Sequence, residues 1–445
     1  MKSSHLTGVL SCLIGDNLAL HGIGGFIENF SGGHCCRTCV SIRLEQQACF
    51  NESEVVLRGT QSFLDQISEM KQQGFPQSLV KKYGIKTQSS LLEISADFPI
   101  ERLHPDVAHD LLEGVIPYTV ELVLGALIQA KFLTLDVINS RIQSFSFQER
   151  NKPQPLKRPK GKGQVKVRGT AKENWVFLRT LPLLVGDFVP EGDKKWGVLI
   201  GLCQVVENVI ASHFTEGDIR YLEQSISTWL AELKRVFPSF RLKPKFHYLI
   251  HYGTHIRRHG PLRYLWTMRY ESKHSTPKTF AVRSRSRKDV CKTMAKKHQR
   301  ALAMHLHDPE FLAPNRTEDP KMSASDMHCL ASHELERVDR DTHVGHAITV
   351  NGVIYKKDDV ILLSGGDVTF GVIRAVLVSA PSHVSLAVTV MDSEFDAHLN
   401  AYKVYPSTRS KIISVGDILD YHPLKVYSVH GESWVVLLWY VCPDD

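Results

Sequence analysis

The sequence predicts a mixed α/β protein with a long, mostly helical middle part and a small β-rich C-terminal domain. Apolar residues recur at helical spacing through much of residues 52–240, whereas beyond residue 346 they form short runs separated by Gly, Asp and Pro. The chain has 445 residues, of which 43% are hydrophobic and 23% are charged, so it can form two or three domains with ordinary cores.

Composition and charge narrow the class of partner. The net charge of +7 is compatible with an acidic polymer. No apolar run reaches the roughly 18 residues that span a bilayer, so we expect no membrane partner. Ser11 and Cys12 interrupt the apolar start of the chain, which argues against a signal peptide. The nine cysteines show no framework of evenly spaced pairs, which favours a reducing compartment.

Residues 1–51 begin with an apolar run, Thr7–Gly15, that ends at Asp16. A short apolar run bounded by turn residues predicts a buried strand, and a carboxylate at the end of such a strand is well placed to face a cleft. Cys36 and Cys39 follow as a Cys-x-x-Cys pair. This part of the chain therefore contributes a candidate acid and a cysteine pair.

Residues 52–240 are predicted to be mostly helical. Helical periodicity is clearest in four segments: Leu111–Leu133, Lys172–Leu184, Lys194–His213 and Thr215–Phe237. A loop at 150–172, rich in proline, glycine and basic residues, interrupts them. We expect this loop to be exposed, and its Lys157, Arg158 and Lys160 are candidates for binding nucleic acid.

Residues 241–306 carry the second half of the candidate site. Pro244 at a first helical turn predicts the helix Pro244–Arg257, which contains His247 and His251. Glu271 follows this helix, and the remainder of the segment is strongly basic.

The last part of the chain changes pattern twice. A polar stretch at 307–345 predicts a linker, and residues 346–445 predict a small sheet or barrel. The expected strands include Val350–Tyr355, Val360–Leu363, Thr369–Val378 and Trp434–Tyr440.

The cysteine pair and the histidine pair together predict a structural zinc site. A two-residue spacer lets Cys36 and Cys39 turn both sulfurs inward, and His247 and His251, four residues apart, project from one helix face. Two thiolates and two imidazoles make a closed tetrahedral zinc site. Because such a site has no open position, a zinc hydrolase is the less favoured interpretation.

Other assignments of these ligands remain open from the sequence. Cys35 could replace Cys36, and His34 and His255 are nearby competitors. The cysteines could also be ordinary buried thiols, and the histidines part of a partly exposed aromatic helix face.

Asp16 and Glu271 are the candidate catalytic carboxylates. Enzymes of the two-metal type hold two Mg²⁺ or Mn²⁺ ions with acidic side chains, because these ions prefer oxygen ligands. Basic residues around Glu271 could neutralise DNA phosphates. The candidates are Arg257, Arg258, Arg269, Lys273, Arg285 and Arg287.

Two alternatives weigh against this interpretation. A lone Glu271 is more often a helix-surface ion pair with Lys273 or Arg269, and a basic run is often a solvated face or a nuclear-localisation patch.

The segment 104–114 could place Asp106, His109, Asp110 and Glu113 on one helix face. We favour a helix N-terminus there, stabilised by its acids, and keep Asp110 as a reserve candidate.

Five segments together resemble transposases of the CACTA (En/Spm-like) group, especially their domesticated or decayed relatives. The segments are Gly15–His21, Cys36–Cys39, His104–Val115, Leu181–Asp187 and Met268–His274. The resemblance covers about residues 5–305. The order of acid, cysteine pair, helical insertion, histidine pair and acid also resembles the core of the recombination-activating recombinase of vertebrate immunity.

This resemblance implies a partial RNase H-like core, interrupted by the helical insertion at 52–240 and followed by the C-terminal β domain. By resemblance, Asp16 matches the second acid of a DDE triad and Glu271 the third, and the cysteine and histidine pairs hold zinc. The implied partner is DNA, the implied compartment is the nucleus, and a homodimer is compatible with the family.

The family's first acid lies on an early strand, and the fifteen residues before Asp16 leave no room for it. We therefore expect an N-terminally truncated, transposase-derived protein whose DNA cleavage and strand transfer are impaired. The alternative is a domesticated protein that binds DNA or chromatin without cleaving it.

Overall fold

The computed structural model describes residues 10–94, 100–159, 163, 165–284, 288–307, 316–317, 342–363, 368–379 and 383–440. It divides into two compact units, which are described separately: residues 1–145 with 151–272, and residues 146–150 with 273–445. Three candidate DNA-binding residues, Lys160, Arg285 and Arg287, lie outside the described residues, as does most of the predicted linker.

The first unit is helical, and its longest connections lie between α1 and η1 and between α5 and α6. Its helices of five residues or more are α1 (Asn17–Gly24), α2 (Thr60–Gln72), α3 (Gln77–Tyr83), η5 (Ala108–Val115), α4 (Ile116–Gln129), α5 (Leu135–Ser144), α6 (Ala171–Val185), α7 (Lys194–Val209), α8 (Glu216–Val236), α9 (Pro244–Tyr248), α10 (Tyr252–His259) and α11 (Thr267–Lys273). Shorter turns are η1 (Glu45–Gln47), η2 (Glu52–Glu54), η3 (Ser90–Glu93), η4 (Ile100–Arg102), η6 (Gly186–Phe188), η7 (Leu249–His251) and η8 (Leu262–Tyr264).

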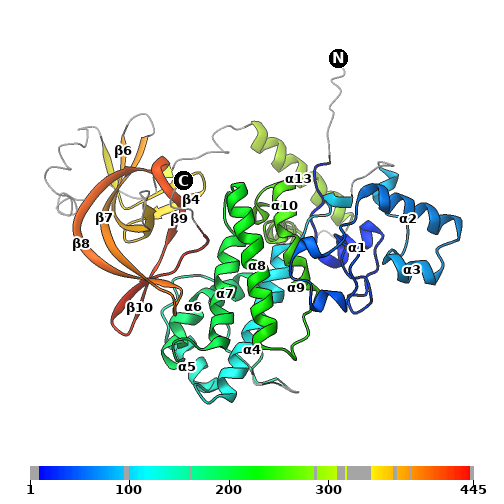
Figure 1. The fold of residues 1–445 in the computed structure, drawn as a ribbon. Helices are drawn as coiled ribbons and strands as arrows, with labels where there is room; N and C mark the ends of the chain where they lie inside the picture. The colour runs from blue at the N-terminus through cyan, green and yellow to red at the C-terminus, as the bar shows by residue number, and fades with distance from the viewer. Residues whose placement is uncertain are drawn as a thin grey trace. The chain divides into compact units, whose positions relative to one another are not determined.

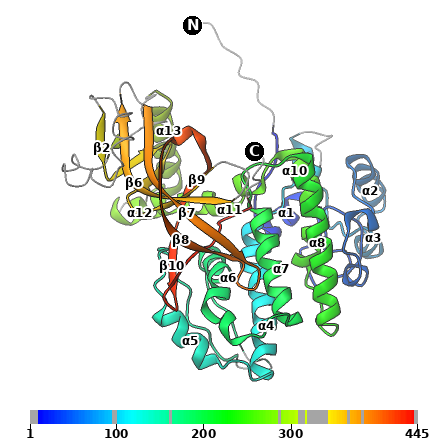
Figure 2. The same cartoon turned by 60° about the vertical axis from the view of Figure 1, so that its left-hand side comes forward.

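Helices α4, α6, α7 and α8 lie side by side and form the main helical layer (Figures 1 and 2). Capping boxes start two of them, with Thr170 and Glu173 at α6 and Thr215 and Asp218 at α8. The predicted helix Thr215–Phe237 is therefore confirmed to within one residue at each end. Burial of the facing aliphatic side chains stabilises this layer.

Helix α4 continues from η5, which is a π-helix, and together they form the stretch Ala108–Gln129. By length and composition alone this stretch could cross a membrane, but the same test admits the core helix of a soluble protein. Val120, Val123, Leu124 and Leu127 are fully buried against the neighbouring helices. In this structure α4 therefore packs as a core helix does, with its apolar side chains against its neighbours.

The predicted helix Pro244–Arg257 is present as α9, the short turn η7 and α10 in direct succession. The predicted strand before Asp16 lies partly outside the described residues. Within them, Leu13 forms an isolated parallel bridge with Leu103. Strands of the described first unit are limited to isolated bridges of this kind, so the RNase H-like core remains a proposal.

The second unit carries helices α12 (Ser275–Ser284) and α13 (Val290–His307) and the β-sheets. The larger sheet has eight strands in the order β10-β11-β8-β7-β6-β5-β9, with β2 paired to β6, and the smaller has the order β1-β3-β4. All pairs are antiparallel. The strands are β1 (Arg316–Thr317), β2 (His343–Gly345), β3 (Ala347–Val350), β4 (Val353–Lys356), β5 (Val360–Leu363), β6 (Thr369–Ser379), β7 (His383–Asp396), β8 (Ala401–Ser414), β9 (Ile418–Leu424), β10 (Val426–Val429) and β11 (Glu432–Val435), with the turn η10 (Val415–Asp417) before β9.

Two local features shape this β-rich part. The long strands β6, β7 and β8 are strongly curved in Figure 1, and register shifts interrupt their pairing, as expected of β-bulges. The prediction of a single strand at Val350–Tyr355 is wrong. Asn351 and Gly352 both have positive φ, and they turn the chain into the β3–β4 hairpin.

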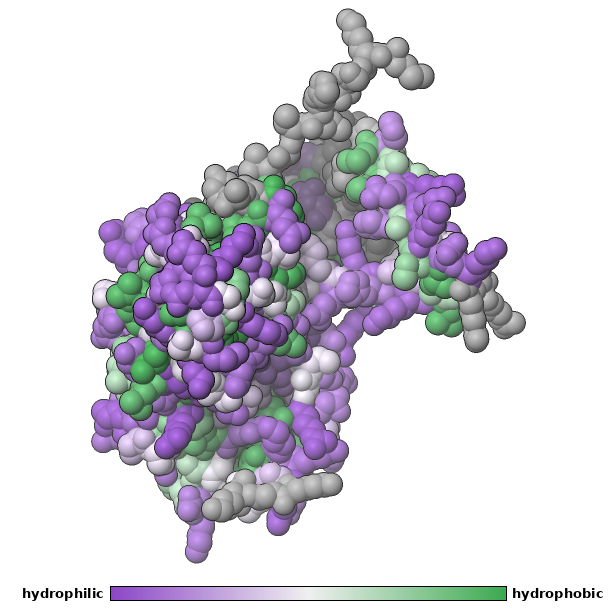
Figure 3. All heavy atoms as spheres, turned by 90° about the vertical axis from the view of Figure 1, so that its right-hand side faces the viewer, coloured by the Kyte–Doolittle hydropathy of each residue, from purple (hydrophilic) through white to green (hydrophobic). Residues whose placement is uncertain are grey.

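The predicted combination of helices with a C-terminal β-rich part is confirmed. On the face shown in Figure 3, hydrophilic side chains predominate and hydrophobic ones are interspersed among them. Apolar side chains scattered in this way need no partner to explain them.

Candidate metal centre

The cysteine pair lies in a tight loop after α1. The amide of Thr38 donates a 3.3 Å hydrogen bond to Cys36 Sγ, which closes the turn between the two cysteines. Arg58 braces this turn in two ways. Its amide donates to the Thr38 carbonyl, and its Nε donates to the carbonyls of Cys36 and Cys39. The loop is therefore held by its own backbone and by one buried arginine.

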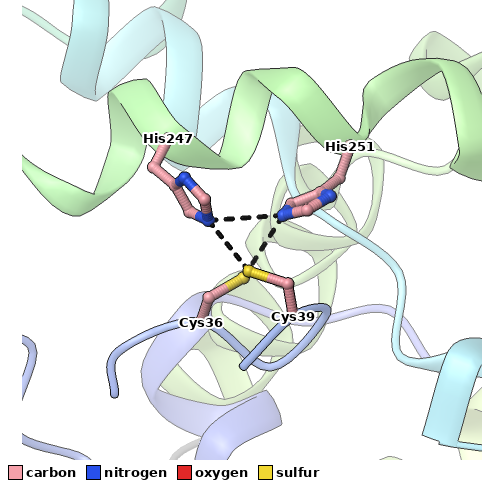
Figure 4. Close-up of side chains that lie close together, drawn as sticks. All are labelled: Cys36, Cys39, His247 and His251. Atoms are coloured by element: carbon pink, nitrogen blue, oxygen red, sulfur yellow. Dashed lines mark hydrogen bonds between the residues drawn. The ribbon is translucent and has the colours of Figure 1, made fainter. Parts of the chain in front are cut away.

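The histidine pair faces this loop from α9 and η7 (Figure 4). Cys39 Sγ lies 3.1 Å from His247 Nε2, Cys36 Sγ lies 3.6 Å from His251 Nε2, and the two Nε2 atoms are 3.4 Å apart. All four side chains are buried, and their ligand atoms lie within 4.8 Å of one another. Among the described residues, this is the one group of three or more potential ligands that is so compact.

The four side chains of the cluster influence one another's pKa values. Burial raises the pKa of Cys36, but the hydrogen bond from Cys39 and the charge of His251 outweigh it and hold that pKa well below its usual value. The hydrogen bond to Cys36 and burial raise the pKa of Cys39. Burial opposes the charging of His251, yet the thiolate of Cys36 and the carboxylate of Glu52 raise its pKa to about 9. A cation that replaced these protons would satisfy both sulfurs.

Glu52 supports the cluster from outside. Its carboxylate accepts a 2.7 Å hydrogen bond from His251 Nδ1 and a second hydrogen bond from the Thr254 hydroxyl. A carboxylate on the far nitrogen of a histidine fixes the tautomer that leaves Nε2 free for a metal. Glu52 could not be found from the sequence, because it lies some 200 residues from His251 and belongs to no motif.

The structure also separates the competing ligands. Cys35 Sγ turns away and donates to Gln46 Oε1, so Cys36 is the cysteine that joins Cys39. His34 is absent from the cluster, and His255 instead lies 3.4 Å from the Thr38 hydroxyl. The donor set is therefore two cysteines and two histidines, which can hold a metal ion.

The two candidate acids lie in the same unit but do not touch. The Asp16 carboxylate caps α1 by accepting a 2.7 Å hydrogen bond from the Ala19 amide. Glu271, on α11, is 56% exposed, and its Oε1 lies 3.9 Å from His109 Nε2. Within the described part of the chain, no hydrogen bond or ion pair joins Asp16 to Glu271. A shared metal site for these two carboxylates thus remains a proposal.

Asn17, next to Asp16, is tied to the metal cluster. Arg37 donates to Asn17 Oδ1 at 2.6 Å and to the His104 carbonyl at 3.0 Å, and Asn17 Nδ2 lies 2.5 Å from Asp110 Oδ1. Burial raises the pKa of Asp110 to about 6. The reserve candidate Asp110 is therefore a buried partner of Asn17, and no exposed ligand atom is evident on it.

Asp106 connects two elements that the sequence did not relate. Its fully buried carboxylate accepts from the Ala108 amide at the start of η5, as the predicted helix N-terminus requires. The same carboxylate accepts from the amide and hydroxyl of Thr267, the first residue of α11. His109 Nδ1 lies 2.5 Å from its Oδ2, and this hydrogen bond raises the pKa of His109 to about 9.

The basic candidates that the structure describes differ in whether a carboxylate already pairs with them. Lys157, Arg158, Arg258, Arg269 and Lys273 are exposed. Arg257 is instead held by two carboxylates, those of Glu216 and Glu223.

Three further exposed basic residues lie on α13. Its Lys292, Lys296 and Arg300 recur at intervals of four residues and are exposed, and the helix contains no acidic residue. Among the described residues they have no ion pair.

No family model and no curated protein matches this chain.

Proposed function

We propose that this chain is a transposase-derived, DNA-binding protein of RNase H-like ancestry, in which Cys36, Cys39, His247 and His251 hold one structural zinc ion. The observation that carries the proposal is the convergence of segments far apart in sequence. The Cys36–Cys39 loop, the His104–Val115 segment and the residues flanking Asp16 and Glu271 all meet within the first unit.

Zinc is the cation that this donor set fits best. A buried pair of thiolates with a pair of imidazoles favours tetrahedral zinc over the hard cations Mg²⁺ and Ca²⁺. Because four protein ligands fill the coordination sphere, the role of the ion is structural. It would fasten the loop after α1 to α9, which lies about 200 residues away in the sequence.

DNA binding is the part of the function that both interpretations of the chain share. The exposed basic residues, including those on α13, suit the phosphate backbone rather than base recognition. In the cleaving interpretation, Asp16 and Glu271 would hold Mg²⁺ or Mn²⁺, which would activate water and stabilise the leaving oxygen. A nuclear protein that acts as a homodimer is compatible with this interpretation.

One observation favours the alternative, a protein that binds DNA or chromatin without cleaving it. The Asp16 carboxylate is engaged as the cap of α1, and no described interaction brings it to Glu271. Such an arrangement leaves Glu271 without its expected acidic partner.

A nicking assay on supercoiled DNA with Mn²⁺ tests the cleaving interpretation. We expect that any nicking by the purified, zinc-loaded chain is lost in Glu271→Gln and retained in Glu93→Gln, a matched change at an exposed glutamate. Nicking that survives Glu271→Gln would refute the assigned role of Glu271. Salt-sensitive DNA binding without Glu271-dependent nicking would favour the binding protein, and the absence of DNA binding would overturn both.

A further inference from the structure

A small cavity in the first unit adjoins the cysteine loop of the metal cluster. Arg37 and Thr38, the two residues between Cys36 and Cys39, are among the residues that line it. Three further segments of the chain supply the other polar side chains of its wall, which are Arg58, Glu101, His255 and Arg258. Three arginines and one glutamate therefore share this cavity, and its wall is predominantly basic.

Two of these arginines are buried, and each has one nitrogen without a partner. Arg58 is 4% exposed, and its Nε and Nη2 donate to backbone carbonyls, whereas its Nη1 has no hydrogen-bond partner among the described residues. Arg37 is 6% exposed, and both of its terminal nitrogens donate to protein oxygens, whereas its Nε has no described partner. Because leaving a buried donor unpaired is unfavourable, each of these nitrogens requires an acceptor.

His255 supplies a third donor to the same cavity. Its side chain is 2% exposed, and burial holds the pKa of the ring well below its usual value, so the ring is neutral. With the Thr38 hydroxyl as the donor to Nε2, 3.4 Å away, the single ring proton lies on Nδ1. Nδ1 is buried and has no partner within the described part of the chain. Three buried N–H donors thus belong to the wall of one cavity.

The charge of the two buried arginines is not balanced by an ion pair. Among the residues that the structure describes, the hydrogen bonds of Arg37 and Arg58 all end on neutral oxygens. Glu101, the acid of the wall, has both carboxylate oxygens engaged by Thr60, one by its amide at 2.9 Å and the other by its hydroxyl. A buried guanidinium stays charged and is unfavourable without an anionic partner.

Two other acidic groups act on these arginines without bonding to them. Asp110 attracts Arg37, but its carboxylate is hydrogen-bonded to Asn17 instead. The cysteine sulfurs of the metal cluster attract Arg58, but a zinc ion bound to them would take up their charge. Neither group supplies an acceptor inside the cavity.

We propose that this cavity binds one monatomic anion of the chloride class, held by Arg37 Nε, Arg58 Nη1 and His255 Nδ1. The free space, about 10 Å³ for the centre of a water-sized sphere, is enough for one small particle but not for phosphate or sulfate. A water molecule accepts only two hydrogen bonds and brings two hydrogens of its own, so an anion suits three converging donors better. The inference goes beyond the proposed function and stands without DNA binding.

The test uses the full, zinc-loaded chain and chloride itself as the probe. Chloride NMR measures the line broadening that bound chloride adds to the free signal. We expect broadening that saturates with protein-bound chloride and is reversed by bromide, which is of the same class. We also expect the unfolding free energy to rise with chloride concentration when chloride replaces gluconate at constant ionic strength, because gluconate is too large for the cavity.

Two variants and one control place the anion. His255→Phe keeps a ring but removes one donor, so chloride affinity should fall at least about 10-fold. Arg58→Gln removes a charged donor and should abolish the broadening. Arg43→Gln is the matched control, because Arg43 donates to the Leu242 carbonyl and does not line the cavity. Zinc content, recorded for each variant, identifies a misfolded chain, and the wild-type displacement by bromide needs no variant.

Three results would overturn the anion site. Wild type without saturable broadening would assign a water molecule to the cavity, and broadening that persists in both Arg58→Gln and His255→Phe would place the anion elsewhere. Displacement of chloride by inorganic phosphate more strongly than by bromide would show a site for an oxyanion. The proposed function fails separately, because a chain that binds chloride in this cavity but does not bind DNA leaves this inference standing.

Discussion

Arg37 donates a 2.6 Å hydrogen bond to the side-chain oxygen of Asn17. Arg37 lies between the two cysteines of the metal cluster, and Asn17 directly follows the candidate acid Asp16. Both side chains are at least nine-tenths buried, so this contact lies in the interior. The loop that would hold zinc therefore also sets the position of the Asp16 segment.

A double-mutant cycle measures this contact. We expect Arg37→Ala and Asn17→Ala each to destabilise the chain, and the pair to show a coupling of about 0.5–3 kcal/mol, because each residue loses its partner when the other is removed. Chemical denaturation gives the free energies of unfolding. The matched control is the cycle of Arg43→Ala with Asn17→Ala, because the Arg43 guanidinium donates to the Leu242 carbonyl instead of to Asn17. A coupling no larger than that of the control would contradict the link.

Glu52 should matter to the metal even though it is not a ligand. Glu52→Gln removes the charge that favours the ligating tautomer of His251, so zinc affinity should fall by about 10–100-fold. Competition with a chelator of known affinity measures the change, and the exposed Glu93→Gln is the control. Equal affinities for the two variants would show that Glu52 does not support the site.

His104 should make the protein sensitive to acid. Burial lowers the pKa of His104 to about 4, and the hydrogen bond to the Pro105 carbonyl partly opposes this shift. An unfolded histidine has a pKa of about 6.5, so between these values the unfolded chain binds more protons than the folded one. The contribution of His104 is therefore fully present above pH 6.5 and is lost as the pH falls towards 4. This loss amounts to about 3 kcal/mol.

His104→Gln cannot take up this proton. The difference in unfolding free energy between pH 7.5 and 4.5 should therefore be smaller in this variant than in wild type, and His298→Gln on exposed α13 should match wild type. An acid sensitivity unchanged by His104→Gln would mean that other groups cause it.

DNA binding should depend on the basic face of α13. Each phosphate neutralised adds about 0.9 to the slope of log affinity against log salt. A triple variant, Lys292→Gln with Lys296→Gln and Arg300→Gln, should lower that slope by about 3 and weaken all DNA sequences equally. The matched control changes three exposed lysines elsewhere, Lys71, Lys81 and Lys131. Equal slopes for the two triple variants would remove α13 from the DNA-binding surface.

The sequence was sufficient to predict which four side chains form the cluster that could hold a metal, because their spacings carry the geometry. A spacer of two residues between the cysteines and of three residues between the histidines places each pair on one side of the backbone, whatever the rest of the chain does. The choice between Cys35 and Cys36 was not predictable, since it depends on which sulfur meets Gln46. The helix limits of α8 were predictable because Thr215 and Asp218 form a local cap.

Contacts between distant segments left no local signal. The pairing of Arg257 with Glu216 and Glu223 spans more than 30 residues, so a basic motif alone could not show that this charge is already neutralised. The two roles of Asp106 depend in the same way on α11, which begins 161 residues later. The β3–β4 hairpin was different, because Asn351-Gly352 is a local turn signal that the strand prediction passed over.

If the cysteine and histidine pairs bind one ion, that ion joins the two ends of the first unit. X-ray absorption at the zinc edge on the purified chain measures this shell of ligands. We expect one zinc per chain with two sulfurs at about 2.3 Å and two nitrogens at about 2.0 Å. We also expect this shell to be lost in Cys39→Ser but kept in Cys35→Ser. A chain without zinc, or a zinc shell without sulfur, would contradict it.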